Sequence, residues 1–171
     1  LVVSQHLEQE FRVLKSMYVL GDHGDTQDDL INRFCDYYQY HPTKRVLMWY
    51  DATGNIRTGN TKMTRAEQAK ALLLKRGWSA SLNTLALRNA EHERKHMVWS
   101  IILSENNPVL PKFRINTVNA RDLLISMQNT GTKEGSDGAV KKDKSSERRL
   151  RSEERKHATD LSDAVDTAVY G

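Results

Sequence analysis

Residues 45–50 of the chain read RVLMWY, Asp51 follows them, and residues 52–55 read ATGN. The first part is rich in bulky apolar and aromatic side chains, which is typical of a buried strand. The Thr, Gly and Asn residues after Asp51 break a strand and turn the chain. The stretch therefore predicts a central strand that ends in a single carboxylate. Sites in open α/β sheets form at this edge, beyond the carboxyl ends of the strands.

Two interpretations of Asp51 are open at this point. An aspartate directly after a strand often accepts hydrogen bonds from its own backbone in a turn, and this role needs no ligand. The same position also suits a carboxylate that binds a metal ion or takes part in catalysis. The rest of the chain has to distinguish these two roles.

The composition is that of a globular chain with a polar surface. Its 171 residues are 38% hydrophobic and 28% charged, which favours a single domain over residues 1–171 with a sizeable core. No apolar run approaches the ~18 residues of a membrane helix. The single cysteine, Cys35, excludes an internal disulfide and fits a reducing compartment. The net charge of +4 permits nucleic-acid binding without indicating it.

Hydrophobic periodicity predicts alternating strands and helices. Residues 1–20 form two apolar runs around a polar turn, which predicts an antiparallel hairpin. Helices are expected to begin at Thr26 and at Thr64, where Thr64 and Glu67 form a capping box, and Gly77 supplies a left-handed stop. The order strand, helix, strand predicts that the second hairpin strand pairs in parallel with the strand before Asp51.

The second half of the chain continues this alternation. A strand is expected over 78–87 and a helix over 93–105, with Met97 and Ile101 among its inward-facing residues. A further helix is expected to begin at Asn119, which is a capping residue type.

Residues 130–156 differ in composition from the rest of the chain. Apolar residues nearly vanish, and nine Lys or Arg residues accompany six Asp or Glu residues between Lys133 and Lys156. Such a stretch cannot bury a core of its own, which predicts a flexible basic loop. One interpretation is a solvated run of charges. The other is a basic arm that contacts a phosphate backbone.

The chain ends in a predicted helix that opens with acidic residues. Its small apolar residues share one face, which suits close packing on a sheet. Asp160 and Asp163 are three positions apart and share a face near the helix N-terminus. Both would also serve as ordinary capping or first-turn acids, which the helix dipole favours. They are nevertheless the candidate partners of Asp51.

These features together resemble the C-terminal nuclease domain of the large terminase subunit of tailed bacteriophages, which has a ribonuclease H-like fold. The resemblance covers nearly the whole chain, and its most specific part is the lysine-rich stretch followed by an acidic helix. It implies an α/β fold in which helices flank a mixed sheet. The stretches that carry it are VLMWYDATGN at 46–55, RINTVNARDLLISMQNTG at 114–131, KKDKSSE at 141–147 and HATDLSDAVDTAVYG at 157–171.

The resemblance implies a metal-dependent endonuclease that cuts concatemeric double-stranded viral DNA during packaging. Members of this family hold two divalent cations, Mg²⁺ or Mn²⁺, between carboxylates of the first strand, the fourth strand and the last helix. Asp51 matches the fourth-strand acid. Asp163 is the best match for the last-helix acid, Asp160 is the next, and Asp166 is the weakest. The lysines expected to hold DNA beside this site are Lys141, Lys142 and Lys144.

The resemblance also implies partners and a location. An ATPase domain precedes the nuclease in the same polypeptide, and the small terminase subunit and the portal protein act with it in the bacterial host cytoplasm. Here no Asp precedes Asp22, no P-loop motif is present, and the chain begins without Met. We therefore expect the first strand, its acid and the ATPase domain to lie upstream of Leu1. Without that acid we expect this chain alone to be inactive.

Two other functions remain open on the sequence. One is a ribonuclease H-like module that binds DNA without cutting it, for which salt-dependent affinity and no cleavage are expected. The other is a nuclease of the resolvase or transposase type, for which a preference for branched DNA would be diagnostic.

Overall fold

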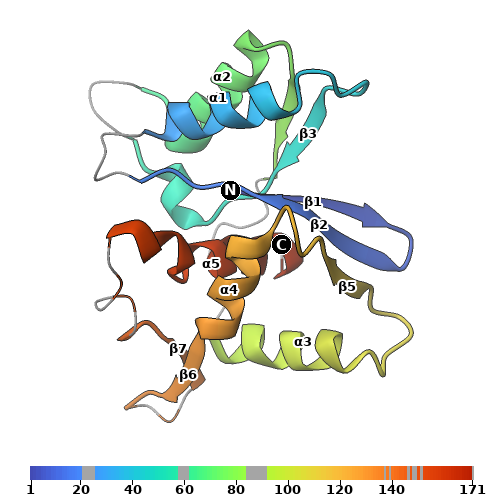
Figure 1. Cartoon of the computed structure of the whole chain (residues 1–171), viewed down its shortest axis with the longest axis vertical. Coiled ribbons are helices and arrows are strands. Elements are labelled where there is room, and N and C mark those ends of the chain that lie inside the picture. The colour runs from blue at the N-terminus through green and yellow to red at the C-terminus, as the bar shows by residue number, and fades with distance from the viewer. Residues whose placement is uncertain are drawn as a thin grey trace. The chain divides into compact units, whose positions relative to one another are not determined.

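The structure is a computed structural model that describes residues 1–20, 26–57, 62–83, 92–136, 138, 140–145, 147, 150 and 152–170. The chain divides into two compact units, which we describe separately. Unit 1 comprises Leu1–Tyr18 and Ala90–Tyr170, and unit 2 comprises Val19–Asn89. Figure 1 labels their elements. The predicted α/β class is confirmed. No helix in the described ranges is long and apolar enough to cross a membrane.

Unit 1 is built on a three-stranded mixed sheet in the order β1-β2-β5. The predicted hairpin is confirmed, because β1 (Val2–Leu7) pairs antiparallel with β2 (Glu10–Ser16). β2 also pairs in parallel with β5 (Lys112–Ile115). The prediction that the second hairpin strand pairs with the strand before Asp51 is therefore wrong. Both edges of β2 are occupied, one by β1 and the other by β5.

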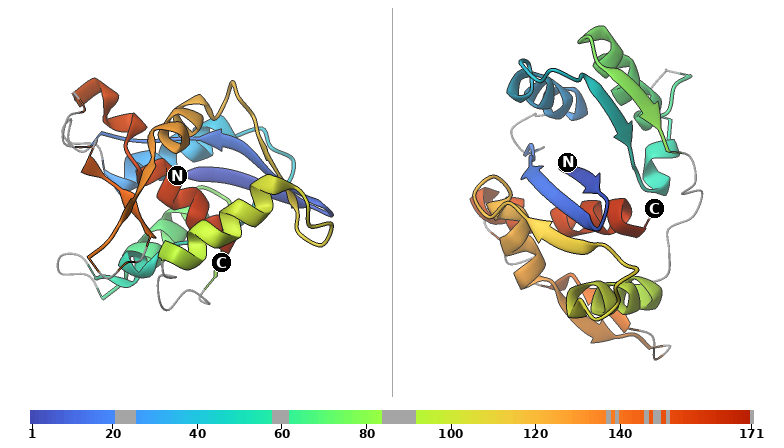
Figure 2. Two further views of the ribbon diagram at one scale, coloured as in Figure 1. Left: turned by 90° about the horizontal axis from the view of Figure 1, so that it is seen from below. Right: turned by 90° about the vertical axis from the view of Figure 1, so that its right-hand side faces the viewer.

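One face of this sheet packs against three helices (Figures 1 and 2). They are α3 (His92–Ser104), α4 (Arg121–Asn129) and α5 (Asp160–Tyr170). Alternate strand residues point to this face, among them Val13 of β2. Leu123 of α4 and Val165 of α5 are 0% exposed and pack with Val13 in the core. The sheet and these helices thus share one hydrophobic core.

Two details of the helices differ from the sequence prediction. Met97 and Ile101 of α3 do not face inward, since they are 56% and 39% exposed. Asn119 is not the N-cap of α4, because Ala120 takes that position without a side-chain hydrogen bond. The side chain of Asn116 instead accepts from the backbone N–H groups of the turn before the helix, including that of Asn119. A nearby side chain, that of Asn116, thus takes the hydrogen-bonding role expected of Asn119.

A two-stranded hairpin lies within the segment 130–156, for which we predicted a loop. β6 (Gly131–Glu134) pairs antiparallel with β7 (Val140–Asp143), and a 3₁₀ helix, η4 (Ser152–His157), follows. Backbone pairing requires no apolar side chains, so a charged segment forms strands when a neighbouring surface supports it. That surface belongs to α3, which packs against β7.

Unit 2 contains a parallel two-stranded sheet, β3 (Arg45–Met48) and β4 (Ser79–Leu82). α2 (Arg65–Lys75) connects the strands and packs against β4 and α1 (Gln27–Tyr37). The predicted helix signals are confirmed. Thr26 and Thr64 each form a capping box, and Gly77 has a left-handed φ of 80° after α2. The predicted strand over 78–87 lies partly outside the described residues, which cover it to Asn83.

β3 is more exposed than the buried central strand that its sequence predicts. Leu47 is 54% exposed. Within the described ranges β3 pairs with β4 alone. One long edge of this apolar strand therefore has no strand partner among those residues.

Candidate functional site

All of the predicted site residues except Asp51 belong to unit 1, and α5 carries two of them. The predicted final helix is confirmed as α5. Asp160 is its first residue and is exposed, and Asp163 lies one turn later and is half-buried. Leu161 and Val165, which are at most 3% exposed, anchor the opposite side of the helix in the core. The packing of α5 into the core thus fixes the backbone positions of both acids.

The start of α5 is fixed by contacts from distant parts of unit 1. The backbone N–H of Thr159 donates to Glu147 Oε1 over 3.0 Å, and the Thr159 hydroxyl donates to the same oxygen. Ser126 Oγ of α4 donates to the carbonyl of Ala158. The Asp163 N–H donates to the Thr159 carbonyl over 2.8 Å. Ser126 and Glu147 lie 32 and 12 residues from their partners, so no local pattern predicted these two contacts, whereas the Asp163–Thr159 bond is the local bond of the first helical turn.

Both carboxylate oxygens of Asp163 are in contact with lysines of the hairpin segment. Lys142 Nζ donates to Oδ1 and Lys144 Nζ donates to Oδ2, each over 2.8 Å. Burial alone raises the pKa of Asp163, but the hydrogen bonds and charges of the two lysines outweigh it and hold the pKa below its ordinary value. Asp163 is therefore a charged carboxylate at neutral pH.

Lys142 has an internal role that the sequence did not predict. Its Nζ donates to Ser162 Oγ over 3.0 Å, to Asp163 Oδ1 over 2.8 Å and to Asp166 Oδ2 over 2.6 Å. These three acceptors match the three donors of an ammonium group. The side chain is only 16% exposed. Its ammonium thus binds α5 acids in this arrangement, where we had expected DNA phosphate.

Asp166, the weakest match in the sequence, is the most buried acid of α5. It is 4% exposed, and its second carboxylate oxygen accepts from Trp99 Nε1 over 2.7 Å. Asp163 and Asp166 are three residues apart on one helix face, a spacing that lets one lysine contact both. The spacing of Asp163 and Asp166 was thus the feature of the sequence that could have indicated a shared lysine contact.

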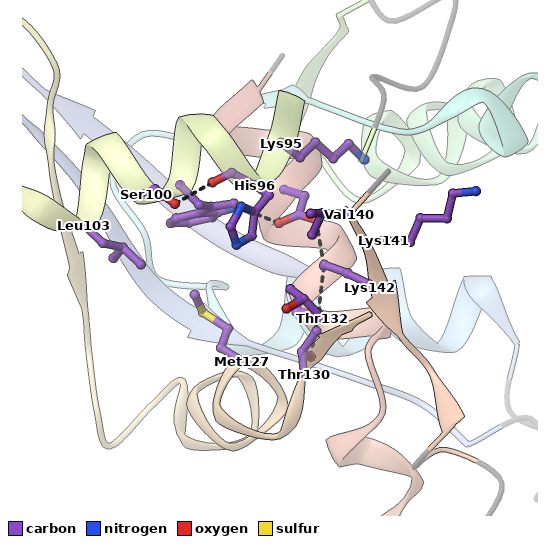
Figure 3. Close-up of a pocket in the computed structure, with 13 residues that line it drawn as sticks. Lys95, His96, Ser100, Leu103, Met127, Thr130, Thr132, Val140, Lys141 and Lys142 are labelled. Atoms are coloured by element: carbon purple, nitrogen blue, oxygen red, sulfur yellow. Dashed lines mark hydrogen bonds and ion pairs between the residues drawn. The ribbon is translucent and has the colours of Figure 1, made fainter. Parts of the chain in front are cut away.

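The remaining hairpin lysines lie differently from Lys142. Lys144 is 47% exposed, and its pKa is raised, chiefly by the hydrogen bond it donates to Asp163. Lys141 is half-buried and, as the neighbour of Lys142 on β7, points to the other face of the strand (Figure 3). Lys144 thus combines a contact to Asp163 with access to solvent.

Asp51, in unit 2, takes the turn role that was one of its two interpretations. It is the N-cap of the 3₁₀ helix η2 (Ala52–Asn55). Its Oδ1 accepts from the Thr53 N–H over 3.0 Å and from the Thr53 hydroxyl. The Gly54 N–H donates to the Asp51 carbonyl over 3.0 Å. A capping carboxylate still has a second oxygen, so the turn role and a ligand role are compatible.

The predicted site acids offer the ligand type of a divalent-cation site. Asp51, Asp160 and Asp163 offer hard carboxylate oxygens, the ligand type that Mg²⁺ prefers. In the part of the chain that the structure describes, no three His, Cys, Asp or Glu side chains are grouped so as to hold a metal ion. The agreement of these acids with a Mg²⁺ site is therefore limited to the type of ligand.

No protein-family model, curated protein or solved structure matches the chain.

The ion pairs of Asp163 predict a pH dependence of stability. A carboxylate whose pKa is lowered in the folded state stabilises it fully above the unfolded pKa, near 3.9, and loses that contribution as pH falls through the folded pKa. The difference in unfolding free energy between wild type and Asp163→Asn is thus expected to be constant above about pH 5 and to shrink towards pH 3.

Urea denaturation of both proteins at pH 6 and pH 3 measures this difference. A Lys144→Ala background serves as the control, in which the pH-dependent part should be smaller because one of the two lysines is gone. Equal differences at the two pH values would contradict the assignment.

Proposed function

We propose that this chain belongs to the nuclease domain of a viral DNA-packaging terminase large subunit. The reaction is metal-dependent endonucleolytic cleavage of double-stranded DNA concatemers, on a ribonuclease H-like fold. The upstream ATPase domain, the small terminase subunit and the portal protein are the proposed partners. The bacterial host cytoplasm is the proposed location.

One observation supports the proposal most directly. The acidic ending of the chain, which is the most specific part of the resemblance, is a helix packed on a mixed sheet, with Asp163 at the boundary between core and solvent. An acid in this position has a fixed backbone and an accessible carboxylate. This combination suits a metal ligand, which must be both placed in advance and reachable by substrate.

The roles of the residues follow from their chemistry. Asp51 and Asp163 supply carboxylate oxygens, and Asp160 is the alternative from α5. Two divalent cations, when bound, would activate the attacking water and stabilise the leaving oxygen. Asp163 would hold a cation through its carboxylate oxygens, and Lys142 or Lys144 would then give up a contact that it now makes with them. A displaced Lys144 would be available to a DNA phosphate.

Cleavage by the polypeptide with its natural upstream sequence tests the proposal. Plasmid DNA should be cut in Mn²⁺ and left intact after chelation, and Asp51→Asn or Asp163→Asn should abolish the cutting. Asp28→Asn is the matched control, because Asp28 is an exposed acid in the first turn of α1. Undiminished cutting by either site variant, with the control active, would overturn the assignment.

The lysine contacts favour one alternative, a ribonuclease H-like module that binds DNA without cutting it. Lys142 and Lys144 contact both carboxylate oxygens of Asp163 and supply the positive charge that balances it. For such a module, DNA affinity should fall steeply with salt, and the extended polypeptide should not cut linear or branched DNA. A preference for branched DNA would instead indicate a nuclease of the resolvase or transposase type.

A further inference from the structure

Unit 1 contains a pocket of about 290 Å³ beside the ion pairs of Lys142. α3 forms one wall, and the β6–β7 hairpin forms the facing wall (Figure 3). Residues from α4 and α5 complete the lining. Ligand pockets in proteins are usually about 300–1,000 Å³, so this volume lies at the lower limit of that range and suits one small molecule.

The polar groups of α5 in the pocket lining are already paired. The Asp166 carboxylate accepts from Trp99 Nε1 over 2.7 Å and from Lys142 Nζ over 2.6 Å. Because this acid is neutralised, its charge does not repel an anion. The pairing also fixes the Trp99 indole, whose ring is half-buried and lines the pocket.

The two ends of the pocket differ in chemistry. In Figure 3, Leu103 and Met127 lie towards one end, and the ammonium end of Lys95 lies towards the other. Leu103 is 59% exposed, which leaves an apolar surface open at its end. The lining thus combines apolar side chains and an aromatic ring with a cationic group at one end.

We propose that this pocket binds a single nucleotide, with its base against Trp99 and Leu103 and its phosphate at Lys95. A planar base stacks on aromatic side chains whatever its identity. A phosphate requires a cation, and the hydroxyl of Thr132 in the lining suits a sugar. The ligand is either a free nucleotide or an unstacked nucleotide of a DNA strand. The proposal rests on the pocket and is independent of the proposed nuclease activity.

Nuclear magnetic resonance of the ¹⁵N-labelled chain without added metal tests the proposal. Deoxyadenosine monophosphate is expected to shift the indole N–H resonance of Trp99, which Trp99→Phe identifies. Deoxyadenosine should bind about tenfold more weakly, and inorganic phosphate should leave this resonance in place. A single-stranded oligodeoxyadenylate that binds more than about tenfold tighter than the mononucleotide identifies a DNA strand as the source, and equal affinity identifies the free nucleotide.

Two variants place the ligand in the pocket. Lys95→Ala should weaken binding about tenfold by removing a phosphate contact, and Leu103→Glu should weaken it at least as much by adding a repelling charge. Lys75→Ala, which removes a helix lysine of unit 2, is the matched control and should leave affinity unchanged. No shift of Trp99 at millimolar nucleotide, an equal shift with phosphate alone, or unchanged affinity in both pocket variants would overturn the proposal.

Discussion

Replacing Lys142 by methionine is expected to lower the unfolding free energy of unit 1 by about 3–5 kcal/mol. Methionine keeps most of the length of the side chain but removes the charge. Asp166, whose side chain is 5% exposed, then keeps the Trp99 N–H and loses its cationic partner. When one partner of a buried ion pair is removed, the other charge stays out of water without a compensating partner. The folded state is therefore destabilised.

Urea denaturation read from the indole resonance of Trp99, which lies in unit 1, measures this loss. Lys144→Met is the matched control, expected to cost no more than about 1 kcal/mol because the Lys144 side chain is 47% exposed. The double variant Lys142→Met/Asp166→Asn should recover part of the loss, since the unpaired charge is gone. A loss in Lys142→Met no larger than that in Lys144→Met would show that the buried pair contributes little.

Leu123→Ala is expected to lower the unfolding free energy by about 2–5 kcal/mol. Leu123 is 0% exposed and packs in the core with Val13 and Val165, so truncation removes buried methyl groups and leaves a cavity between the helices and the sheet. The same denaturation experiment measures the effect.

Leu103→Ala in the same unit is the control for this substitution. Leu103 is 59% exposed, so the same change of side chain leaves no enclosed cavity and should cost less than about 1 kcal/mol. Similar losses in the two variants would contradict the assignment of Leu123 to the centre of the core.

Local chemistry made much of the secondary structure predictable. The capping boxes at Thr26 and Thr64 and the glycine at Gly77 act through backbone groups within a few residues, so a short window of sequence contains the whole signal. The first hairpin and the acidic helix α5 were predictable for the same reason.

Long-range pairing was not predictable in this way. The sequence shows that β2 is a strand, but not that β5, nearly a hundred residues later, takes the edge expected for β3. The charges of the hairpin segment were visible, but their partners were not. Lys142 and Lys144 look alike in the sequence, and only the alignment of β7 beside α5 buries the first and leaves the second half-exposed.

The candidate site shows the same division. Asp163 could be proposed from its helix position, whereas its two lysine contacts depend on how the hairpin packs. Asp51 could be placed at the end of a strand, and the structure adds its capping bonds with Thr53. A metal-ligand role for these acids stays a prediction that the cleavage assay addresses.

The exposure of β3 has a practical consequence for the purified protein. Leu47 is 54% exposed, and among the described residues the strand pairs with β4 alone. Unpaired backbone groups beside apolar side chains form a template for the strand of another molecule. At high concentration, such intermolecular contacts would compete with the monomeric state. A lysine in place of Leu47 is the kind of edge charge with which natural sheets prevent them.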